Sequence, residues 1–455
     1  MVTSVKLKTP EFVSHDAESQ AARRPLVFIL LWVGQLISLT GSGLTGFSLG
    51  IWAYQRTGST TQYALIFTFT ILPTIIISPF AGSVVDRWDR RRALIASQIG
   101  VGAITILLLL LLLSGQLQVW HIYITTALQA VLNTFQWLAL SAAVTLVAPA
   151  KHLGRAAGMT QLSEAVARVI APILAGVLLL RFGLWGVLAI NSFTALAAVS
   201  TLLFVRIPKA NPESAEKLRH ALRRDISLGW SYVTAHKGLL SLLVLFALTN
   251  FLSGTVIVLS TPFILSFASV ATLGTILSVA GGGMVAGGLV MSAWGGPKQR
   301  VYAVIGFQIF AGLSIVIAGM SSSPVIVGAT TFVFALSVSS SLAASQAIWQ
   351  SKVEPGLQGR VFAVRRMIAW STLPIAYLLA GPLADKVFNP LLVAGGPLAA
   401  SVGRIVGVGP GRGIGLLFVF LGSFVVLISA VAVMSPHLRL LEQELPDIVV
   451  PRPQS

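Results

Sequence analysis

The chain has 455 residues, of which 55% are hydrophobic and only 10% are charged. Soluble proteins carry about 25% charged residues, so this composition excludes an ordinary soluble domain and indicates a chain that lies mostly in a membrane. The chain has no cysteine, which excludes disulfides, thiolate metal sites and cysteine nucleophiles.

Successive apolar runs, each long enough to cross a bilayer as a helix, fill most of the chain. Residues 1–24 precede them and are polar. We predict twelve spans, at residues 25–53, 62–85, 93–114, 119–147, 156–180, 184–206, 238–266, 270–294, 301–320, 324–349, 361–386 and 413–436. Several contain Gly or Pro, which membrane helices tolerate because neighbouring helices satisfy the freed backbone groups. An even number of spans places both termini on one side.

The basic residues predict which side that is. With the N-terminus inside, the outer loops hold five basic residues and Arg168 lies within a span, which leaves 25 of the 31 Lys and Arg on the inner side. The outer five are Arg56, Arg181, Lys386, Arg404 and Arg412. Cytoplasmic loops carry such an excess, so both termini are expected in the cytoplasm. Membrane topology therefore accounts for the net charge of +17 without a nucleic-acid partner.

The spans divide into two sets of six. The longest inner connection, residues 207–237, contains Leu218, Leu222, Ile226 and Trp230 at four-residue spacing. This pattern predicts an amphipathic helix on the inner membrane surface, and a site for a calmodulin-like partner is the alternative. The expected organisation is an N-terminal tail (1–24), a six-helix bundle (25–206), the linker (207–237), a second six-helix bundle (238–436) and a C-terminal tail (437–455).

The two halves also repeat in sequence. VAPAKHLGR, which ends at Arg155 after the fourth span, corresponds to VEPGLQGR, which ends at Arg360 after the tenth. The loop that begins at Gly82 has a weaker counterpart at residues 288–300, at nearly the same offset. Parallel repeats of six spans with nested inverted repeats are typical of one large class of secondary transporter.

Four segments show a family resemblance. They are WVGQLISLTGSG (32–43), YQRTGS (54–59), GSVVDRWDRRR (82–92) and VEPGLQGRVFAV (353–364). The chain resembles the major facilitator superfamily over essentially its whole length, and within it the bacterial macrolide-efflux branch of drug exporters. Asp89 stands where most of the superfamily has Gly, as is common in that branch.

The resemblance implies a secondary transporter in the bacterial cytoplasmic membrane that exports a lipophilic or amphiphilic small molecule by alternating access. It also implies a monomer, no cofactor, no metal and proton antiport. Two departures weaken the expectation of proton antiport. Gln129 stands where many proton-coupled exporters carry a buried Arg, and the fifth-span antiporter motif is reduced to ARVIAPILAG, which keeps Pro172 and Gly176. Within the same class, a lipid or lysophospholipid flippase and a siderophore exporter are the alternatives.

The loop after the second span is the first candidate site. By resemblance, its Gly82, Asp86, Arg87, Arg90 and Arg91 form a gate in which the acid lies near the start of the eleventh helix. The physical argument agrees, because a glycine permits close helix approach and an acid is stabilised by the positive N-terminus of a helix. The alternative is that the arginines only enforce topology.

Asp385 is the second candidate gate residue. It ends the eleventh span in GPLADK, which mirrors the Gly-x-x-x-Asp of the second span on the opposite side of the membrane. We therefore predict a role at an outer gate. The alternative is a solvated helix end that pairs with Lys386.

Glu164 and Arg168 are the candidate coupling residues. They lie one turn apart in the fifth span, on one helix face. An ionised group at mid-membrane costs at least about 2.5 kcal/mol, so its presence indicates a function. One hypothesis is that Glu164 takes up a proton or meets a cationic substrate, with Arg168 tuning it. The other is that the two form a structural pair.

Polar and aromatic residues on the first, fourth, fifth and seventh spans are the candidate cavity. These are Gln35, Asn133, Gln136, Trp137, Gln161 and Asn250. Amides and an aromatic wall suit a bulky amphiphile, and hydrogen bonding between helices is the alternative for each amide.

Enzyme motifs are lacking. There is no Walker loop, the histidines have no metal-ligand spacing, and one acid does not make a catalytic cluster. GGGMVAGG (281–288) superficially suggests a dinucleotide loop, but it lies inside an apolar run with no strand before it, so we interpret it as a helix-packing segment. A membrane-embedded enzyme and a non-transporting scaffold remain the alternatives from other classes.

Overall fold

The computed structural model describes residues 15–85, 89–147, 153–204, 227–297, 299–354, 356–445 and 447, and every regular element in these ranges is a helix. The predicted all-helical class is confirmed. The long helices are α1 (His15–Thr57), α2 (Thr60–Val85), α3 (Arg90–Leu113), α4 (Val119–Val147), α5 (Leu153–Phe204), α7 (Lys237–Leu265), α8 (Val270–Trp294), α9 (Arg300–Met320), α10 (Pro324–Lys352), α11 (Gln358–Pro382) and α14 (Arg412–Met434). The short elements are η3 (Leu383–Phe388), α12 (Asn389–Leu391), α13 (Gly403–Val406), α15 (Pro436–Arg439) and α16 (Leu441–Glu444).

Ten stretches of helix in the described residues are long and apolar enough to cross a membrane. One of them, in α5, is 46 residues long, which is more than twice the length that a single span needs. The chain leaves the helical conformation at Gly183, where φ is 65°, so α5 is two helices joined at a bend. The number of spans stays a prediction at twelve. The amphipathic helix expected in the linker lies mostly outside the described residues. The described part of the linker begins at residue 227, and residues 227–235 are helical.

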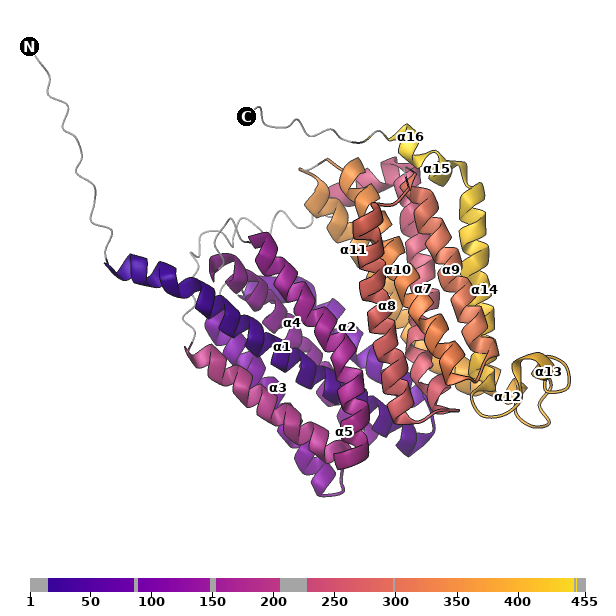
Figure 1. The fold of residues 1–455 in the computed structure, drawn as a ribbon, viewed down its shortest axis with the longest axis horizontal. Coiled ribbons are helices and arrows are strands. Elements are labelled where there is room, and N and C mark those ends of the chain that lie inside the picture. Colours follow the sequence, from indigo (N-terminus) through magenta and orange to yellow (C-terminus); the bar gives the residue numbers. More distant parts are fainter. Residues whose placement is uncertain are drawn as a thin grey trace, which may run out of the picture.

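The long helices form two groups (Figure 1). In the first, α1 packs on α5, α2 on α4, and α3 on both α4 and α5. In the second, α8 packs on α10, α9 on α10 and α14, and α7 on α11. The two groups contact each other chiefly through α5 against α8 and through α2 against α11.

Glycines bring α8 close to its neighbours on two sides. A Cβ on Gly283 would lie 2.4 Å from the carbonyl oxygen of Phe332 in α10. A Cβ on Gly281 would lie 2.4 Å from the side chain of Val169 in α5. The glycine-rich run is thus a helix-packing segment, as the sequence predicted, and it serves both the packing within one group and the contact between groups.

The outer segment between η3 and α14 forms a lobe with its own short helices (Figure 1). Arg412 at the start of α14 is buried, and its guanidinium donates to the carbonyl oxygens of Val406 (3.1 Å) and Ser321 (3.4 Å). It also lies 5.6 Å from the ring centroid of Phe263. Arg412, which the sequence indicated only as an outer-loop charge, therefore connects α13 of this lobe to α7 and to the end of α9.

The end of the chain is fixed to the second group by a buried lysine. Lys352, at the end of α10, is 3% exposed, and its Nζ lies 2.9 Å from the Asp447 carboxylate. The same ammonium donates to the carbonyl oxygens of Glu442 and Leu445. The hydrogen bond from Lys352 lowers the pKa of the Asp447 carboxyl. These contacts hold α16 against the end of α10.

Candidate functional site

Asp385 joins the two groups of helices at the N-terminus of α2. Its carboxylate accepts hydrogen bonds from the Ser59 hydroxyl (3.0 Å), the Thr60 amide (3.2 Å), the Thr61 amide (2.8 Å) and the Thr61 hydroxyl (2.8 Å). One turn earlier, Gly381 faces the same segment, and a Cβ there would lie 2.3 Å from the Cα of Thr61. The carboxylate therefore binds the free amides and the positive end of a helix dipole that belong to the other group.

The partners of Asp385 distinguish between its two predicted environments. All the hydrogen-bond donors described for its carboxylate are in the Ser59–Thr61 segment, whereas the neighbouring Lys386 is exposed. A solvated helix end would not make four bonds to the opposite group. We call this contact, formed by Asp385, Gly381 and the segment Ser59–Thr61, the outer latch.

Glu164 and Arg168 form an ion pair on α5, with 3.9 Å between Oε2 and Nη2 and with side-chain exposures of 32% and 68%. Ala171 on this helix packs towards Gly43 of α1, and Val169 packs towards α8. At 100° per residue, Glu164 and Arg168 lie between these two packed faces.

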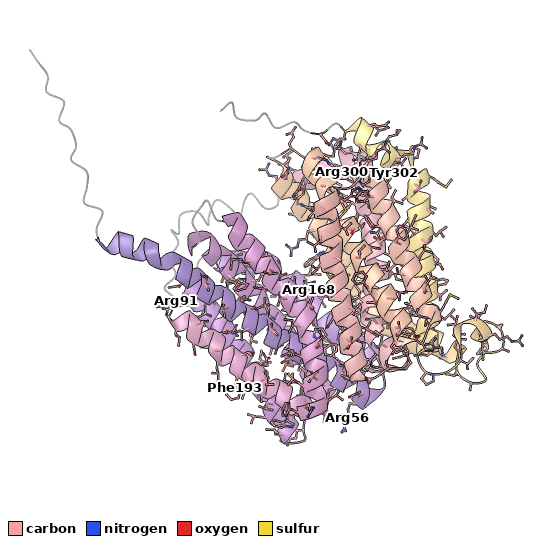
Figure 2. The ribbon with its side chains drawn as sticks, viewed as in Figure 1. Arg56, Arg91, Arg168, Phe193, Arg300 and Tyr302 are labelled. Atoms are coloured by element: carbon pink, nitrogen blue, oxygen red, sulfur yellow. The ribbon has the colours of Figure 1, made fainter. Side chains whose placement is uncertain are left out.

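The side of α5 opposite to the ion pair has a different character. Between residues 162 and 180, the exposed residues on that side are all apolar: Leu162, Ile170, Ile173, Leu174, Val177 and Leu180. An apolar exposed face suits lipid, so the charged face is the one directed at the space between the two groups. Figure 2 shows Arg168 where the groups adjoin. The structure thus places the predicted pair on the side of α5 away from its exposed apolar face, while its role in coupling stays a prediction.

Trp137 of α4 faces the second group. The side chain is 49% exposed, and the Arg366 guanidinium of α11 lies 5.8 Å from its ring centroid. Asn133 is one turn away on the same face and is also exposed. Trp137 and Asn133 therefore border the same space between the groups.

Other predicted cavity residues take part in helix packing. Gln136 is 8% exposed, and its amide donates to Gln98 (3.0 Å) and Gln35 (3.3 Å). Gln98 in turn donates to Ser38 at 3.0 Å. This buried network links α1, α3 and α4. Its hydrogen bonds satisfy the side-chain amides, which have no water to bond to in an apolar environment. The contribution of Gln35 and Gln136 to a cavity stays a prediction, and the Gln161 side chain lies outside the described part of the chain.

A cavity of about 260 Å³ lies in the second group, between α7, α10 and α11. Asn250 lines it and also donates to the Ala369 carbonyl oxygen at 3.3 Å, while its predicted role in a substrate cavity stays a prediction. Gln346, Arg365 and Arg366 contribute the other polar groups, and the remaining wall is mostly apolar and aromatic.

The inner loop is described only in part. Gly82 lies in α2, but Asp86 and Arg87 lie outside the described residues, as does the side chain of Arg90. Arg91 donates to the carbonyl oxygens of Leu202 (3.2 Å) and Leu203 (2.6 Å), so it caps the end of α5 within its own group (Figure 2).

The structure explains why an acid stands at position 89, which the sequence alone did not. Its carboxylate accepts hydrogen bonds from the backbone amides of Arg91 (2.9 Å) and Arg92 (3.4 Å), so it is the N-cap of α3.

Sequence reasoning missed the two arginines of the cavity. Arg365 and Arg366 were counted among the inner-side charges that set topology, although both lie inside the predicted span 361–386. Their position within a span is the signal that identifies them, because charges there need partners. The hydrogen-bonding partners of Asp385 were missed too, since nothing in the sequence connects the segment Ser59–Thr61 with the end of the eleventh span.

The chain is similar to known proteins over most of its length. The family model described as Major Facilitator Superfamily matches residues 31–377. Macrolide efflux protein A of Streptococcus pyogenes is 25% identical over 374 residues, which cover 80% of this chain and 90% of that protein. Multidrug resistance protein MdtG of Escherichia fergusonii is 30% identical over 204 residues, 44% of each chain.

Solved structures show the same fold. A bacterial homolog of the human lysosomal transporter Spinster, in an inward-facing and unoccupied conformation, superposes with a TM-score of 0.70 at 15% identity, covering 94% of this chain and 99% of that one. A D-xylose-proton symporter superposes with a TM-score of 0.62 at 12% identity, covering 88% of this chain and 97% of the other.

Proposed function

The chain belongs to the Major Facilitator Superfamily, and on that premise we propose that it exports a lipophilic or amphiphilic small molecule across the cytoplasmic membrane by alternating access. It is a multi-pass membrane transporter and not an enzyme. The efflux proteins among its relatives favour export over uptake.

The outer latch carries the proposal. A transporter that opens to each side in turn needs contacts between its two halves that form in one state and break in the other. The four hydrogen bonds of Asp385 cross from one group of helices to the other, and they involve a helix terminus that water can satisfy when the latch opens. Charged and aromatic side chains at Arg168, Trp137 and Arg366 border the space between the groups.

The remaining architecture is proposed on the same basis. Two bundles, 25–206 and 238–436, are expected to move against each other as units. Counting α5 as two spans and adding α4, which has 29 residues, to the ten apolar stretches gives twelve. The loop with Gly82, Asp86, Arg87 and Arg90 is proposed as the inner counterpart of the outer latch.

Proton coupling is proposed through Glu164. Its carboxylate is two-thirds shielded and has a single described cation, Arg168, at 3.9 Å. An acid in this position is able to exchange its proton for a substrate as the halves move, because its neutral form costs less in a membrane than its charged form.

Glu164→Gln is expected to reduce transport driven by a pH gradient to the level of empty vesicles, while exchange of substrate across the membrane without a gradient continues. The amide keeps the size of the side chain but carries no proton. The measurement is uptake of a radiolabelled macrolide into inverted membrane vesicles with and without an imposed pH gradient. Glu442→Gln makes the same substitution outside the spans and is the matched control, with unchanged gradient-driven uptake expected. Unchanged gradient-driven uptake in Glu164→Gln would leave the ion pair a structural role.

A further inference from the structure

The cavity of the second group holds two adjacent arginines whose described partners are all neutral. The Arg365 guanidinium donates to the Gln346 side-chain oxygen (2.8 Å) and to the Ser345 hydroxyl (3.1 Å). It also lies 5.3 Å from the ring centroid of Trp349. Amide, hydroxyl and ring orient this guanidinium, but none of them cancels its charge.

Arg366 lies between two indole rings. Its guanidinium carbon is 4.4 Å from the ring centroid of Trp370 on the same helix and 5.8 Å from that of Trp137 across the space between the groups. A guanidinium that stacks on an aromatic face keeps its N–H edge available, and that edge matches an oxyanion in a bidentate arrangement. Arg366 is exposed, so a ligand is able to reach it.

The charge balance of this region favours an anion. Among the described residues, Arg168 also borders this space, and it already has Glu164 as its partner. Arg365 and Arg366 lie about 6–8 Å along α11 beyond residue 361, where the predicted span begins. Two guanidiniums at this depth are costly unless a counter-charge reaches them.

The rest of the wall determines what kind of anion fits. Leu242, Phe246 and Phe362 line the cavity beside the arginines, so an apolar body would be buried next to the charged head. We propose that this cavity is a binding site for amphiphilic organic anions, in which Arg365 and Arg366 hold a carboxylate or phosphate and the aromatic walls hold the apolar body. The inference rests on the proposed export function and names the substrate class for it.

The experiment uses the full chain in phosphatidylcholine nanodiscs and a matched pair of fluorescent probes, 1-pyrenebutyrate and the neutral 1-pyrenebutanol. Energy transfer from tryptophan to pyrene reports binding, because Trp137, Trp349 and Trp370 surround the site. Saturable binding is expected for the acid, with only unsaturable partitioning for the alcohol. Arg365→Gln and Arg366→Gln are each expected to weaken binding of the acid about tenfold.

Two further variants separate charge from folding. Arg366→Lys keeps the charge but loses the bidentate N–H edge, so it is expected to bind the acid more weakly than the unaltered protein and more tightly than Arg366→Gln. A merely structural loss would not produce this order. Arg404→Gln removes an exposed arginine of α13 and is expected to bind the acid normally. Equal binding of acid and alcohol, or unchanged affinity in both glutamine variants, would overturn the proposal.

Competition then identifies the source of the anion. Displacement of the probe by lysophosphatidic acid supports a phosphate-bearing lipid, and displacement by fatty carboxylates alone supports an organic acid. Displacement by inorganic phosphate at equal potency would contradict a site for amphiphiles. Vesicles that transport a macrolide while the nanodiscs show no preference for the acid would overturn this inference and leave the export function standing. Anion binding without any vesicle transport would support the binding site and contradict the proposed export function.

Discussion

Asp385→Ala is expected to open the outer side of the protein and to reduce transport at least about tenfold. The substitution removes four hydrogen bonds that cross between the groups, and bonds to a charged acceptor contribute about 1.5–3 kcal/mol each. In the proposed cycle these bonds form only when the outer side is closed, so their loss is expected to shift the population away from that state and to slow transport.

The absence of cysteine makes this shift directly measurable. Spin labels at Gln116→Cys and Ser401→Cys, both exposed near the outer end, report the distance between the groups. A longer distance in Asp385→Ala is expected, together with normal yield and elution of the purified protein. Lys386→Gln is the control and is expected to keep both distance and transport. If Asp385→Ala keeps the short distance and full transport, the latch has no role in the cycle.

The sequence was enough to predict the acid of the outer latch, but not the groups that donate hydrogen bonds to it. The mirrored Gly-x-x-x-Asp pattern identified Asp385 as a candidate gate residue, because inverted repeats place equivalent residues on opposite sides of the membrane. The sequence did not identify Ser59, Thr60 and Thr61 as partners. They become donors only because α2 begins there and because Gly381 lets α11 approach its first turn.

The two cavity arginines show a different limit of sequence reasoning. Arg365 and Arg366 fit the inner-side excess of positive charge, and membrane topology is a sufficient explanation for arginines in a loop. It does not explain arginines within a helix that continues for another sixteen residues to Pro382. What distinguishes a topological arginine from a binding one is its surroundings, here the rings of Trp349 and Trp370, and these depend on how α10 and α11 pack.

The helix-packing interpretation of the glycine-rich run did not depend on tertiary detail. Its position inside an apolar stretch was enough to exclude a phosphate-binding loop. Which glycine meets which helix was beyond prediction, because Gly281 and Gly283 are two residues apart and point to opposite neighbours, α5 and α10. Because one glycine packs between the groups and the other within a group, substitutions at the two positions test whether the groups move as units.

Gly283→Ala is expected to destabilise the protein by about 1–3 kcal/mol and to lower its melting temperature. The new methyl group would meet the Phe332 carbonyl oxygen at 2.4 Å, and a backbone atom cannot turn away as a flexible side chain does. Gly288→Ala is the matched control on the same helix, because nothing lies within 4 Å of a Cβ at that position. Thermal unfolding of the detergent-purified variants measures the difference.

Gly281→Ala completes the comparison, because it faces Val169 of the other group and not a neighbour in its own. It is expected to leave the melting temperature within the range of Gly288→Ala but to slow transport, since the closed outer state must bring Gly281 and Val169 together. A loss of stability in Gly281→Ala as large as that in Gly283→Ala would mean that α5 and α8 unfold as one unit, and it would count against two groups that separate during the cycle.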